Sequence, residues 1–218
     1  MKITLLILFL IAVIAGGLYV NKNPVKMDLS TLMPFSQITP TVKKKSVGTG
    51  EKNLTNPPQA CSGTQLPAAT EGPYYKSGTP LRKKIDDGIS GNKLTLQGYV
   101  LDTNCRPVAN AWLDFWQADG TGKYDNTGFK LRGHQFTDAE GKYALETIIP
   151  GEYPGRTPHV HAKVKARENS PELTVQLFIP GVEKNQNDGI FNKELLMNIT
   201  ESQNGKAGTF NFIINTNL

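Results

Sequence analysis

The chain contains little histidine and cysteine and almost no helical periodicity. Its 218 residues include three histidines and two cysteines. Neither cysteine lies in a close Cys/His cluster of the kind that binds zinc. The only plausible helical segment is short, around Asn192–Met197. These absences argue against a zinc-cluster protein, a helical bundle and a doubly wound fold.

Net charge is also absent from most of the chain. Residues 61–218 carry 17 basic and 17 acidic residues, whereas residues 1–60 carry seven lysines against two acidic residues. No stripe of Lys and Arg with interleaved aromatic residues occurs in the neutral part. This distribution argues against nucleic acid as a partner.

The N-terminal part has the composition of a targeting segment followed by a spacer. Residues 3–20 are uncharged and mostly apolar, which fits a secretory signal peptide or a short membrane anchor. Ala15–Gly17 offers small residues for cleavage, so a cleaved and an anchored form both stay open. Residues 21–60 contain five prolines and the triplet Lys43–Lys45, which is typical of a flexible basic linker. We expect residues 1–20 to direct the protein out of the cytoplasm, as a secreted, periplasmic or membrane-anchored form.

The remaining residues, 61–218, have the pattern of one all-β domain. Short segments alternate between apolar and polar residues and are separated by turn-like runs. With 38% hydrophobic residues the chain can bury one core. This spacing predicts an antiparallel β-sandwich with long loops. The expected strands are Lys93–Leu101, Ala111–Trp116, Tyr143–Ile149, His159–Lys165, Leu173–Ile179 and Thr209–Ile214.

The two cysteines, Cys61 and Cys105, both belong to this domain. Outside the cytosol, two such residues can pair in a disulfide bond. The sequence favours a bridge over two buried free thiols but leaves both open.

Two of the three histidines lie in one expected strand, in the run His159-Val160-His161. In an extended strand, residues i and i+2 project from the same face, so both imidazoles can reach one point in space. This is the geometry of a pair of metal ligands. The simpler alternative is that the histidines form the polar side of an alternating strand, together with Lys163 and Lys165.

Short motifs follow one another between Thr70 and Val164. They are Thr70–Tyr75, Leu96–Asp102, Pro107–Trp116, Gly122–Tyr124, Arg132–Gly133, Thr137–Tyr143, Thr147–Pro154 and Arg156–His161. The most specific part is the order Gly-x-Tyr, then Pro-Gly-x-Tyr-Pro, then Arg-x-x-His-x-His. Together the motifs resemble the intradiol ring-cleavage dioxygenases, a family that includes catechol, protocatechuate and hydroxyquinol dioxygenases.

The resemblance implies an iron enzyme. Family members hold one non-haem Fe(III) with two tyrosinates and two histidines, which implies Tyr124, Tyr153, His159 and His161 as the ligands here. It also implies O2 and a small aromatic diol as substrates. Both atoms of O2 would enter the catechol-type ring and give a cis,cis-muconate-type diacid. Phenolate oxygen is a hard anionic donor that favours ferric iron, so the chemistry of the ligand set agrees.

Three residues are expected to act on the substrate. By the same resemblance, Tyr153 takes up a substrate proton, Arg156 faces the aromatic ring and Pro73 lies at the substrate. A fixed guanidinium there would stabilise negative charge as it develops. The alternative for Arg156 is a structural salt bridge to Glu152 or Asp138.

Two features depart from the family pattern. Only Pro154-Gly155 separates the second tyrosine from the arginine, so the loop over the expected iron site is short and should open the pocket. Residues 21–60 lack the apolar heptad pattern of the helical dimerisation segment of catechol dioxygenases, so dimerisation by that route is not expected and the oligomeric state stays open. His134 matches no ligand position and is expected near the site or on the surface.

The short loop and the neutral domain also predict a substrate preference. Small neutral catechols or hydroxyquinol-type rings should be preferred over protocatechuate, because no surplus cation is dedicated to a carboxylate. Lys163, Lys165 and Arg132 remain candidates for pairing with one.

A non-catalytic alternative shares part of this pattern. Gly-x-Val-x-Asp, Pro-Val-x-x-Ala and Thr-Asp-x-x-Gly-x-Tyr also describe strands and turns of transthyretin-like β-sandwich binding modules at the cell surface. The tyrosine and histidine set separates the two, since a binding module has no reason to assemble it.

Overall fold

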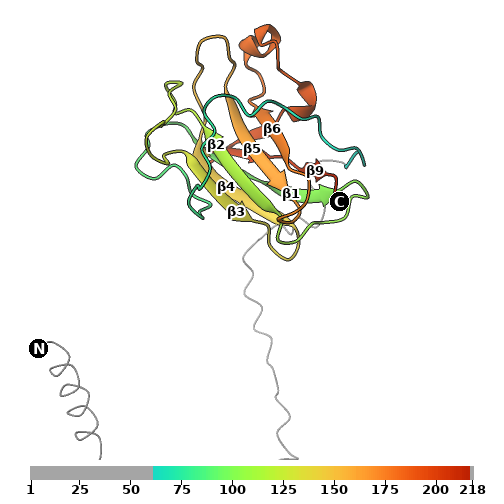
Figure 1. Cartoon of the computed structure of the whole chain (residues 1–218). Coiled ribbons are helices and arrows are strands. Elements are labelled where there is room, and N and C mark those ends of the chain that lie inside the picture. Colours follow the sequence, from blue (N-terminus) through green and yellow to red (C-terminus); the bar gives the residue numbers. More distant parts are fainter. Residues whose placement is uncertain (1–60, 217–218) are drawn as a thin grey trace, which may run out of the picture. The chain divides into compact units, whose positions relative to one another are not determined.

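The computed structural model describes residues 61–216 (Figure 1). The expected signal or anchor at residues 1–20 and the linker at residues 21–60 lie outside this part of the chain, as do residues 217–218. Within residues 61–216, none of the helices has the length and apolar character that crossing a bilayer requires.

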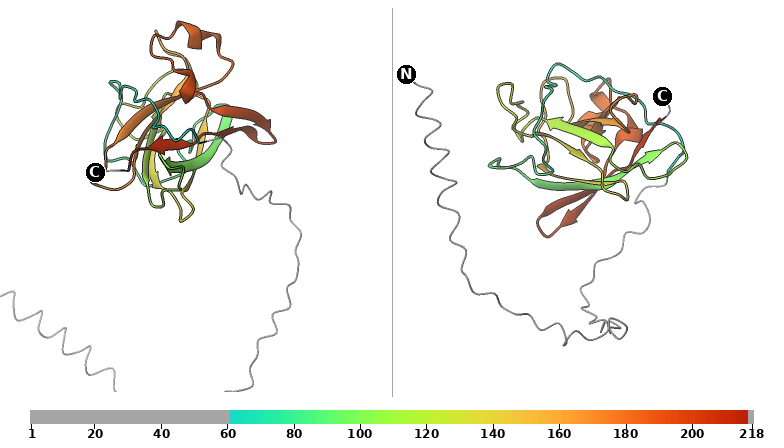
Figure 2. Two further views of the ribbon diagram at one scale, coloured as in Figure 1. Left: turned by 90° about the vertical axis from the view of Figure 1, so that its right-hand side faces the viewer. Right: turned by 60° about the horizontal axis from the view of Figure 1, so that its bottom comes forward.

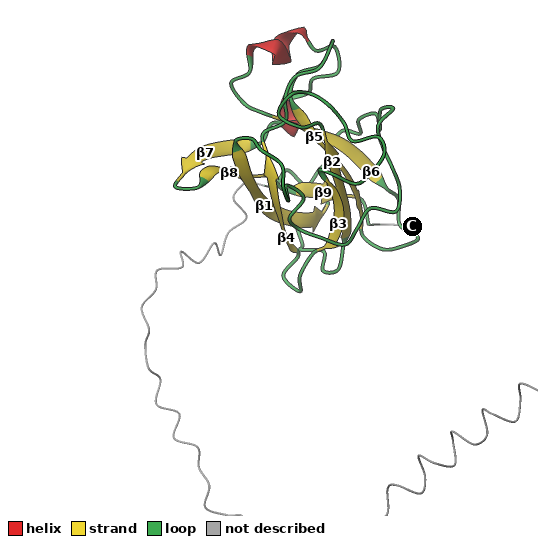
Figure 3. Cartoon of the chain, turned by 90° about the vertical axis from the view of Figure 1, so that its left-hand side faces the viewer, coloured by secondary structure: helices red, strands yellow, loops and turns green. Residues whose placement is uncertain are grey.

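The described part of the chain forms nine strands and two short 3-10 helices. The strands are β1 (Lys93–Asp102), β2 (Trp112–Gln117), β3 (Arg132–Phe136), β4 (Lys142–Ile148), β5 (His159–Lys165), β6 (Leu173–Phe178), β7 (Asn198–Ser202), β8 (Gly205–Thr209) and β9 (Phe212–Ile214). The helices are η2 (Glu183–Asn187) and η3 (Lys193–Leu195), drawn in red in Figure 3.

The strands make two sheets that enclose one core, so the prediction of an all-β sandwich is confirmed. One sheet has the order β4-β1-β8-β7, with β9 also paired to β1, and the other has the order β3-β2-β5-β6. Figure 1 shows β2, β5 and β6 side by side. The expected strands that correspond to β1, β2, β4, β5 and β6 agree with the structure to within one residue at either end.

The C-terminal part differs from the expectation. A single strand was expected over Thr209–Ile214, but β8 ends at Thr209 and β9 begins at Phe212. Both pair in parallel with β1, β8 along Leu94–Gln97 and β9 along Val100–Asp102. The sandwich is therefore not purely antiparallel, because the ten-residue β1 is long enough to take two partners along one edge. The β7–β8 hairpin, also unexpected, projects beyond the rest of its sheet (Figure 2).

The core is built from the inward-facing residues of alternating strands. β1 contributes Leu94, Leu96 and Val100, and β2 contributes Leu113 and Phe115, all of them buried. Complete burial of such side chains stabilises a fold by about 1.5–3 kcal/mol each. Because alternate residues face opposite ways, the other face of the β3-β2-β5-β6 sheet is left to polar and aromatic side chains.

Candidate metal centre

The outer face of the β3-β2-β5-β6 sheet carries rows of directly paired residues. Strand pairing places them in register, so each row crosses neighbouring strands. In order along the strands, the rows are Phe136–Trp112–Lys165, His134–Asp114–Lys163–Thr174, Arg132–Trp116–His161–Gln176 and His159–Phe178. We call the first row the open end of this face and the last two rows the covered end.

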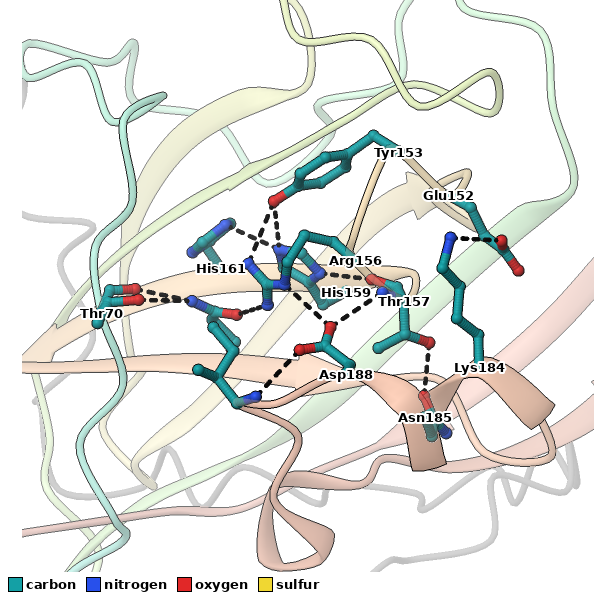
Figure 4. Close-up of polar contacts among 12 residues, drawn as sticks. Thr70, Glu152, Tyr153, Arg156, Thr157, His159, His161, Lys184, Asn185 and Asp188 are labelled. Atoms are coloured by element: carbon teal, nitrogen blue, oxygen red, sulfur yellow. Dashed lines mark hydrogen bonds and ion pairs between the residues drawn. The ribbon is translucent and has the colours of Figure 1, made fainter.

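The two predicted histidine ligands lie at the covered end and point to the same place. The Nε2 atoms of His159 and His161 are 3.0 Å apart (Figure 4). The Nδ1 atom of His159 lies 2.7 Å from the carbonyl oxygen of Thr157. Since a carbonyl only accepts hydrogen bonds, Nδ1 carries the hydrogen and Nε2 of His159 keeps its lone pair free.

The two predicted tyrosine ligands reach the histidines from two loops. The Tyr153 hydroxyl lies 3.4 Å from His159 Nε2. The ring of Tyr124 meets that of Tyr153 edge-on, with centroids 5.8 Å apart, and lies 6.3 Å from the ring of His161. All four predicted donors, Tyr124, Tyr153, His159 and His161, therefore converge, although they come from three segments of the chain.

The glycine of the Gly-x-Tyr motif, Gly122, is required by close backbone packing. Gly122 adopts φ +81°, and a Cβ atom there would lie 1.9 Å from the backbone oxygen of Glu152. Only glycine lets the loop that carries Tyr124 pack backbone against backbone on the loop that carries Tyr153.

The Pro-Gly pair after Tyr153 closes a tight turn. The N–H of Arg156 donates to the carbonyl of Tyr153 at 2.9 Å, and Gly155 has φ +77°. This is the pattern of a type II turn with proline second and glycine third. The short loop therefore sets Tyr153 and Arg156 next to each other, and the two residues form an isolated β-bridge.

Burial determines the charge of the four donors. It lowers the pKa of His159 to about 4 and holds the pKa of His161 well below its usual value, so both imidazoles are neutral at pH 7. Burial and the neighbouring Tyr153 phenol raise the pKa of Tyr124, and burial raises that of Tyr153 against the opposing charge of Arg156. The imidazoles are thus in their metal-binding form, whereas the phenols need a nearby cation to ionise.

The polar atoms at this point fit a metal ion. The Tyr124 hydroxyl is buried and makes no hydrogen bond of good geometry, although the Tyr153 hydroxyl is close enough to perturb its pKa. A buried polar atom without a partner is costly and calls for an explanation such as an ion. No group of three or more His, Cys, Asp or Glu side chains in residues 61–216 is arranged to hold a metal. The cluster at the covered end instead combines two imidazoles with two phenols, a donor set suited to a hard trivalent ion.

Arg156 is held by three partners at the rim of this cluster. Its Nε donates to Asp188 Oδ2 at 2.9 Å and its Nη1 donates to the Tyr153 hydroxyl at 3.2 Å. Its Nη2 donates to Gln176 Oε1. A salt bridge is therefore present, but neither of the two partners named for the structural alternative, Glu152 and Asp138, makes it. Exposed Glu152 pairs with Lys184 at 2.9 Å, and Asp138 accepts backbone N–H groups in its own turn.

Aromatic rings and the segment 70–76 cover the cluster. The indole of Trp116 stacks on His161 with centroids 4.6 Å apart and planes at 10°. Tyr74 stacks on Tyr124 at 4.3 Å and meets Tyr153 edge-on at 6.1 Å. The predicted substrate residue Pro73 lies beside Tyr74, in the lining of a cavity of about 400 Å³. Aromatic side chains thus shield His161 and the Tyr124 hydroxyl from water.

The three candidate cations for a substrate carboxylate differ in how far other groups already engage them. Lys163 pairs with Glu71 at 2.7 Å and also with Glu172. Arg132 is buried, and its Nε and Nη2 donate to the backbone oxygen of Asp125, while its Nη1 is buried without a hydrogen-bond partner. Lys165 lies at the open end, with its Nζ 4.9 Å from the centre of the Trp112 ring.

The remaining predicted residues lie away from the cluster. His134 belongs to the second row and contacts the Thr79 carbonyl through Nδ1 at 2.7 Å. Cys61 and Cys105 form a disulfide bond with an S–S distance of 2.09 Å. The sequence interpretation missed Tyr74, Trp116, Gln176 and Asp188 as parts of the site. The position of Trp116 could have been inferred from the sequence, because it alternates with Asp114 and Trp112 and so shares their sheet face. No sequence pattern indicated Asp188.

The fold and the cluster define a class of protein: a β-sandwich with phenol and imidazole donors gathered on the covered outer face of one sheet. A family model described as "Dioxygenase" matches residues 70–216. The chain belongs to the intradiol ring-cleavage dioxygenase family.

Similar proteins agree with this assignment. Catechol 1,2-dioxygenase 2 of Acinetobacter lwoffii is 31% identical over 142 residues, which is 53% of this chain and 51% of that protein. The dioxygenase domain of a dioxygenase carbohydrate-binding protein fusion from Streptomyces sp. SirexAA-E is 44% identical, with a TM-score of 0.68 over 71% of this chain and 100% of the other. The intradiol ring-cleavage dioxygenase from Tetranychus urticae is 29% identical, with a TM-score of 0.64 over 70% and 94%. The chain spans about half the length of the curated relatives it matches.

Proposed function

We propose that the protein is an Fe(III)-dependent intradiol dioxygenase that opens a catechol-type ring between its two hydroxyl-bearing carbons. Both atoms of O2 enter the product, a cis,cis-muconate-type diacid. The observation that carries the proposal is the convergence of Tyr124, Tyr153, His159 and His161 at one buried point. Family membership supports it, since family members use non-haem Fe(III) and act on catechol-type substrates with O2.

The four donors would hold the iron. When bound, ferric iron would supply a Lewis acid that binds the diol oxygens and withdraws electron density from the ring. The neutral imidazoles of His159 and His161 offer nitrogen lone pairs, and the hydrogen bond from His159 to Thr157 fixes the orientation of that ring. Trp116, stacked on His161, keeps water from the second histidine.

Tyr153 and Arg156 are placed to handle protons and charge. Tyr153 is the donor that Arg156 touches, because Nη1 donates to its hydroxyl oxygen at 3.2 Å. As a phenolate, Tyr153 Oη would accept a proton from a substrate hydroxyl, and the guanidinium would stabilise the phenolate before that transfer. Arg156 is positioned in advance by its other two contacts, which is the condition for effective electrostatic stabilisation.

Oxygen uptake by the purified iron-containing protein with catechol tests the proposal directly. With ¹⁸O2, both labelled atoms should appear in the two carboxyl groups of the ring-opened product. An iron-containing protein that consumes no O2 with catechol, hydroxyquinol or protocatechuate would contradict the enzyme function. It would favour the non-catalytic binding module instead.

We also propose that the domain of residues 61–218 works outside the cytoplasm, delivered by residues 1–20 and spaced by residues 21–60. The Cys61–Cys105 disulfide supports this location, because disulfides persist in oxidising compartments. Cell fractionation, with mass spectrometry of the N-terminus, tests it. A full-length protein in the cytosol with both thiols reduced would contradict the location.

A further inference from the structure

A buried carboxylate lies behind the arginine of the site. Asp188 follows η2, and its side chain is 1% exposed. Its Oδ2 accepts hydrogen bonds from Arg156 Nε and from the backbone N–H of Thr157, both at 2.9 Å (Figure 4). Its Oδ1 accepts from the backbone N–H of Ile190 at 3.1 Å. The carboxylate is therefore fixed on both oxygens.

Asp188 determines where the guanidinium of Arg156 lies. The Arg156 side chain is 18% exposed, and Nε is the atom nearest the backbone end of its rigid fork. With Nε tied to Asp188 and Nη2 tied to Gln176, Nη1 is left to point at the Tyr153 hydroxyl. Removal of Asp188 would free the fork to rotate and would leave a mostly buried cation without its counter-charge.

The same segment braces the loop that carries the ligands. Thr157 Oγ1 donates to Asn185 Oδ1 at 2.6 Å, and Asn185 Nδ2 donates to the carbonyl of Ile179 at 2.9 Å. The carbonyl of Thr157 in turn accepts from His159 Nδ1. Asn185 and Asp188 thus hold Thr157 between them, one residue from the arginine and two residues from the first histidine.

We propose that Asp188 is a positioning residue for Arg156: it aims the guanidinium at the Tyr153 oxygen without touching the substrate or the four metal donors. This inference rests on the proposed function, because only a dioxygenase site needs the arginine in that place. Asp188 affects kcat only through the position of Arg156. Asn185, which is uncharged, holds the neighbouring Thr157 in place through its hydrogen bond to the Thr157 hydroxyl.

The test compares Asp188→Asn with Glu152→Gln in the iron-containing protein. Glu152 is a matched control, since it also joins the ligand loop to η2 through an ion pair, but on the surface. In Asp188→Asn we expect unchanged iron content, a kcat for catechol about 10–100-fold lower, and a KM altered less than about threefold. Glu152→Gln should keep kcat within about twofold of the wild type. Unchanged kcat or lost iron in Asp188→Asn would overturn the proposal.

Two further measurements separate positioning from general damage. The double variant Asp188→Asn/Arg156→Lys should lose no more kcat than Arg156→Lys alone, because both changes act through one group; losses that multiply would contradict this. Asp188→Glu keeps the charge but moves it by one methylene, so its kcat should lie between those of the wild type and Asp188→Asn. If Asp188→Asn does not fold, wild-type kcat in Asp188→Glu would overturn the proposal.

The visible absorption of the iron-containing protein reports on Arg156 without any turnover. The tyrosinate absorption band should shift in Asp188→Asn and stay in place in Glu152→Gln, because only the first change disturbs the hydrogen bond to Tyr153. If the wild-type protein binds iron but cleaves no diol, the proposed function fails, and the band shift alone decides whether Asp188 positions Arg156.

Discussion

The open end and the covered end lie on the same sheet face but differ in exposure. At the open end Phe136 is 40% exposed, while at the covered end Trp116 is 0% and His161 1% exposed. Both ends pair an indole with a nitrogen-bearing side chain: the Lys165 cation lies over Trp112, and neutral His161 stacks on Trp116. The difference in exposure therefore comes from the loops that cover one end of this sheet face rather than from the strands themselves.

Burial by these loops changes the chemistry that is open to the side chains at each end. The open end lines a groove of about 1000 Å³ that is open to solvent, where a cation over an aromatic ring contributes only about 0.5–1 kcal/mol. At the covered end the segment 70–76, the loop of Tyr124 and the turn at Tyr153 exclude water. Burial there keeps the imidazoles neutral and leaves the Tyr124 hydroxyl without solvent or a hydrogen-bond partner, which suits these donors to a metal ion.

The largest expected difference between the two ends is metal binding. His161→Ala should lower the iron content of the purified protein by about tenfold or more, because three ligands hold the metal less tightly and water enters the site. His134→Ala, one row nearer the open end, is the control and should keep full iron content. Equal iron in both variants, measured by elemental analysis, would show that the covered end is not the metal site.

The next effect concerns turnover rather than metal content, at the arginine of the covered end. Arg156→Lys should keep iron and colour but lose about 2–4 kcal/mol of transition-state stabilisation, because lysine supplies a point charge without the planar fork. Arg167→Lys, at the groove of the open end, should leave kcat/KM unchanged. Steady-state kinetics with catechol measures both, and unchanged turnover in Arg156→Lys would make that residue structural.

Substrate preference sharpens the comparison further. Near the covered end Arg156 is paired with Asp188, and Lys163 with Glu71 and Glu172, so these cations are not available for a substrate carboxylate. Catechol, 4-methylcatechol and hydroxyquinol should therefore have higher specificity constants than protocatechuate. A protocatechuate value tenfold above the others, about 1.4 kcal/mol, would overturn the preference while leaving the iron site intact.

The smallest effect belongs to the groove at the open end, which Asp102 of β1 also lines. Burial opposes ionisation of Asp102, but hydrogen bonds from Arg106 and Asn104 outweigh it, so the pKa of the Asp102 carboxyl is lowered. A lowered folded-state pKa stabilises the fold above the unfolded value of about 3.9, and this contribution is lost as the pH falls through the folded value. Asp102→Asn should reduce the free energy of unfolding at pH 6 and approach the wild type near pH 2. A constant difference across that range, in urea titrations, would show that the lost stability does not depend on ionisation.

Much of the fold follows from local sequence pattern. Alternation of apolar and polar residues located β1, β2, β5 and β6, because each strand buries one face against the same core. The parallel pairing of β1 with β8 and β9 had no such signal, since it joins segments more than 100 residues apart. η3 lies within the short helical segment expected around Asn192–Met197, whereas η2 was too short to leave a detectable periodicity.

Some residues of the candidate site could likewise be inferred from local sequence motifs, and others could not. The tyrosines and histidines stand in ordered motifs, so they could be proposed as ligands from the sequence, and the two-residue spacing predicted a short loop between Tyr153 and Arg156. The partner of Arg156 could not be predicted, because the expected acids were near in sequence, whereas Asp188 lies 32 residues away. Gln176 and Tyr74 were missed for the same reason, as only strand pairing and packing bring them to the cluster.

The visible spectrum and metal content of the purified protein test the central claim, that the covered end is a ferric site built from two tyrosines and two histidines. After expression with ample iron, we predict one ferric ion per chain and a red to burgundy colour from a tyrosinate-to-iron charge-transfer band. Stoichiometric zinc with no visible band would contradict the account, because zinc accepts the same nitrogen and oxygen donors without that chemistry.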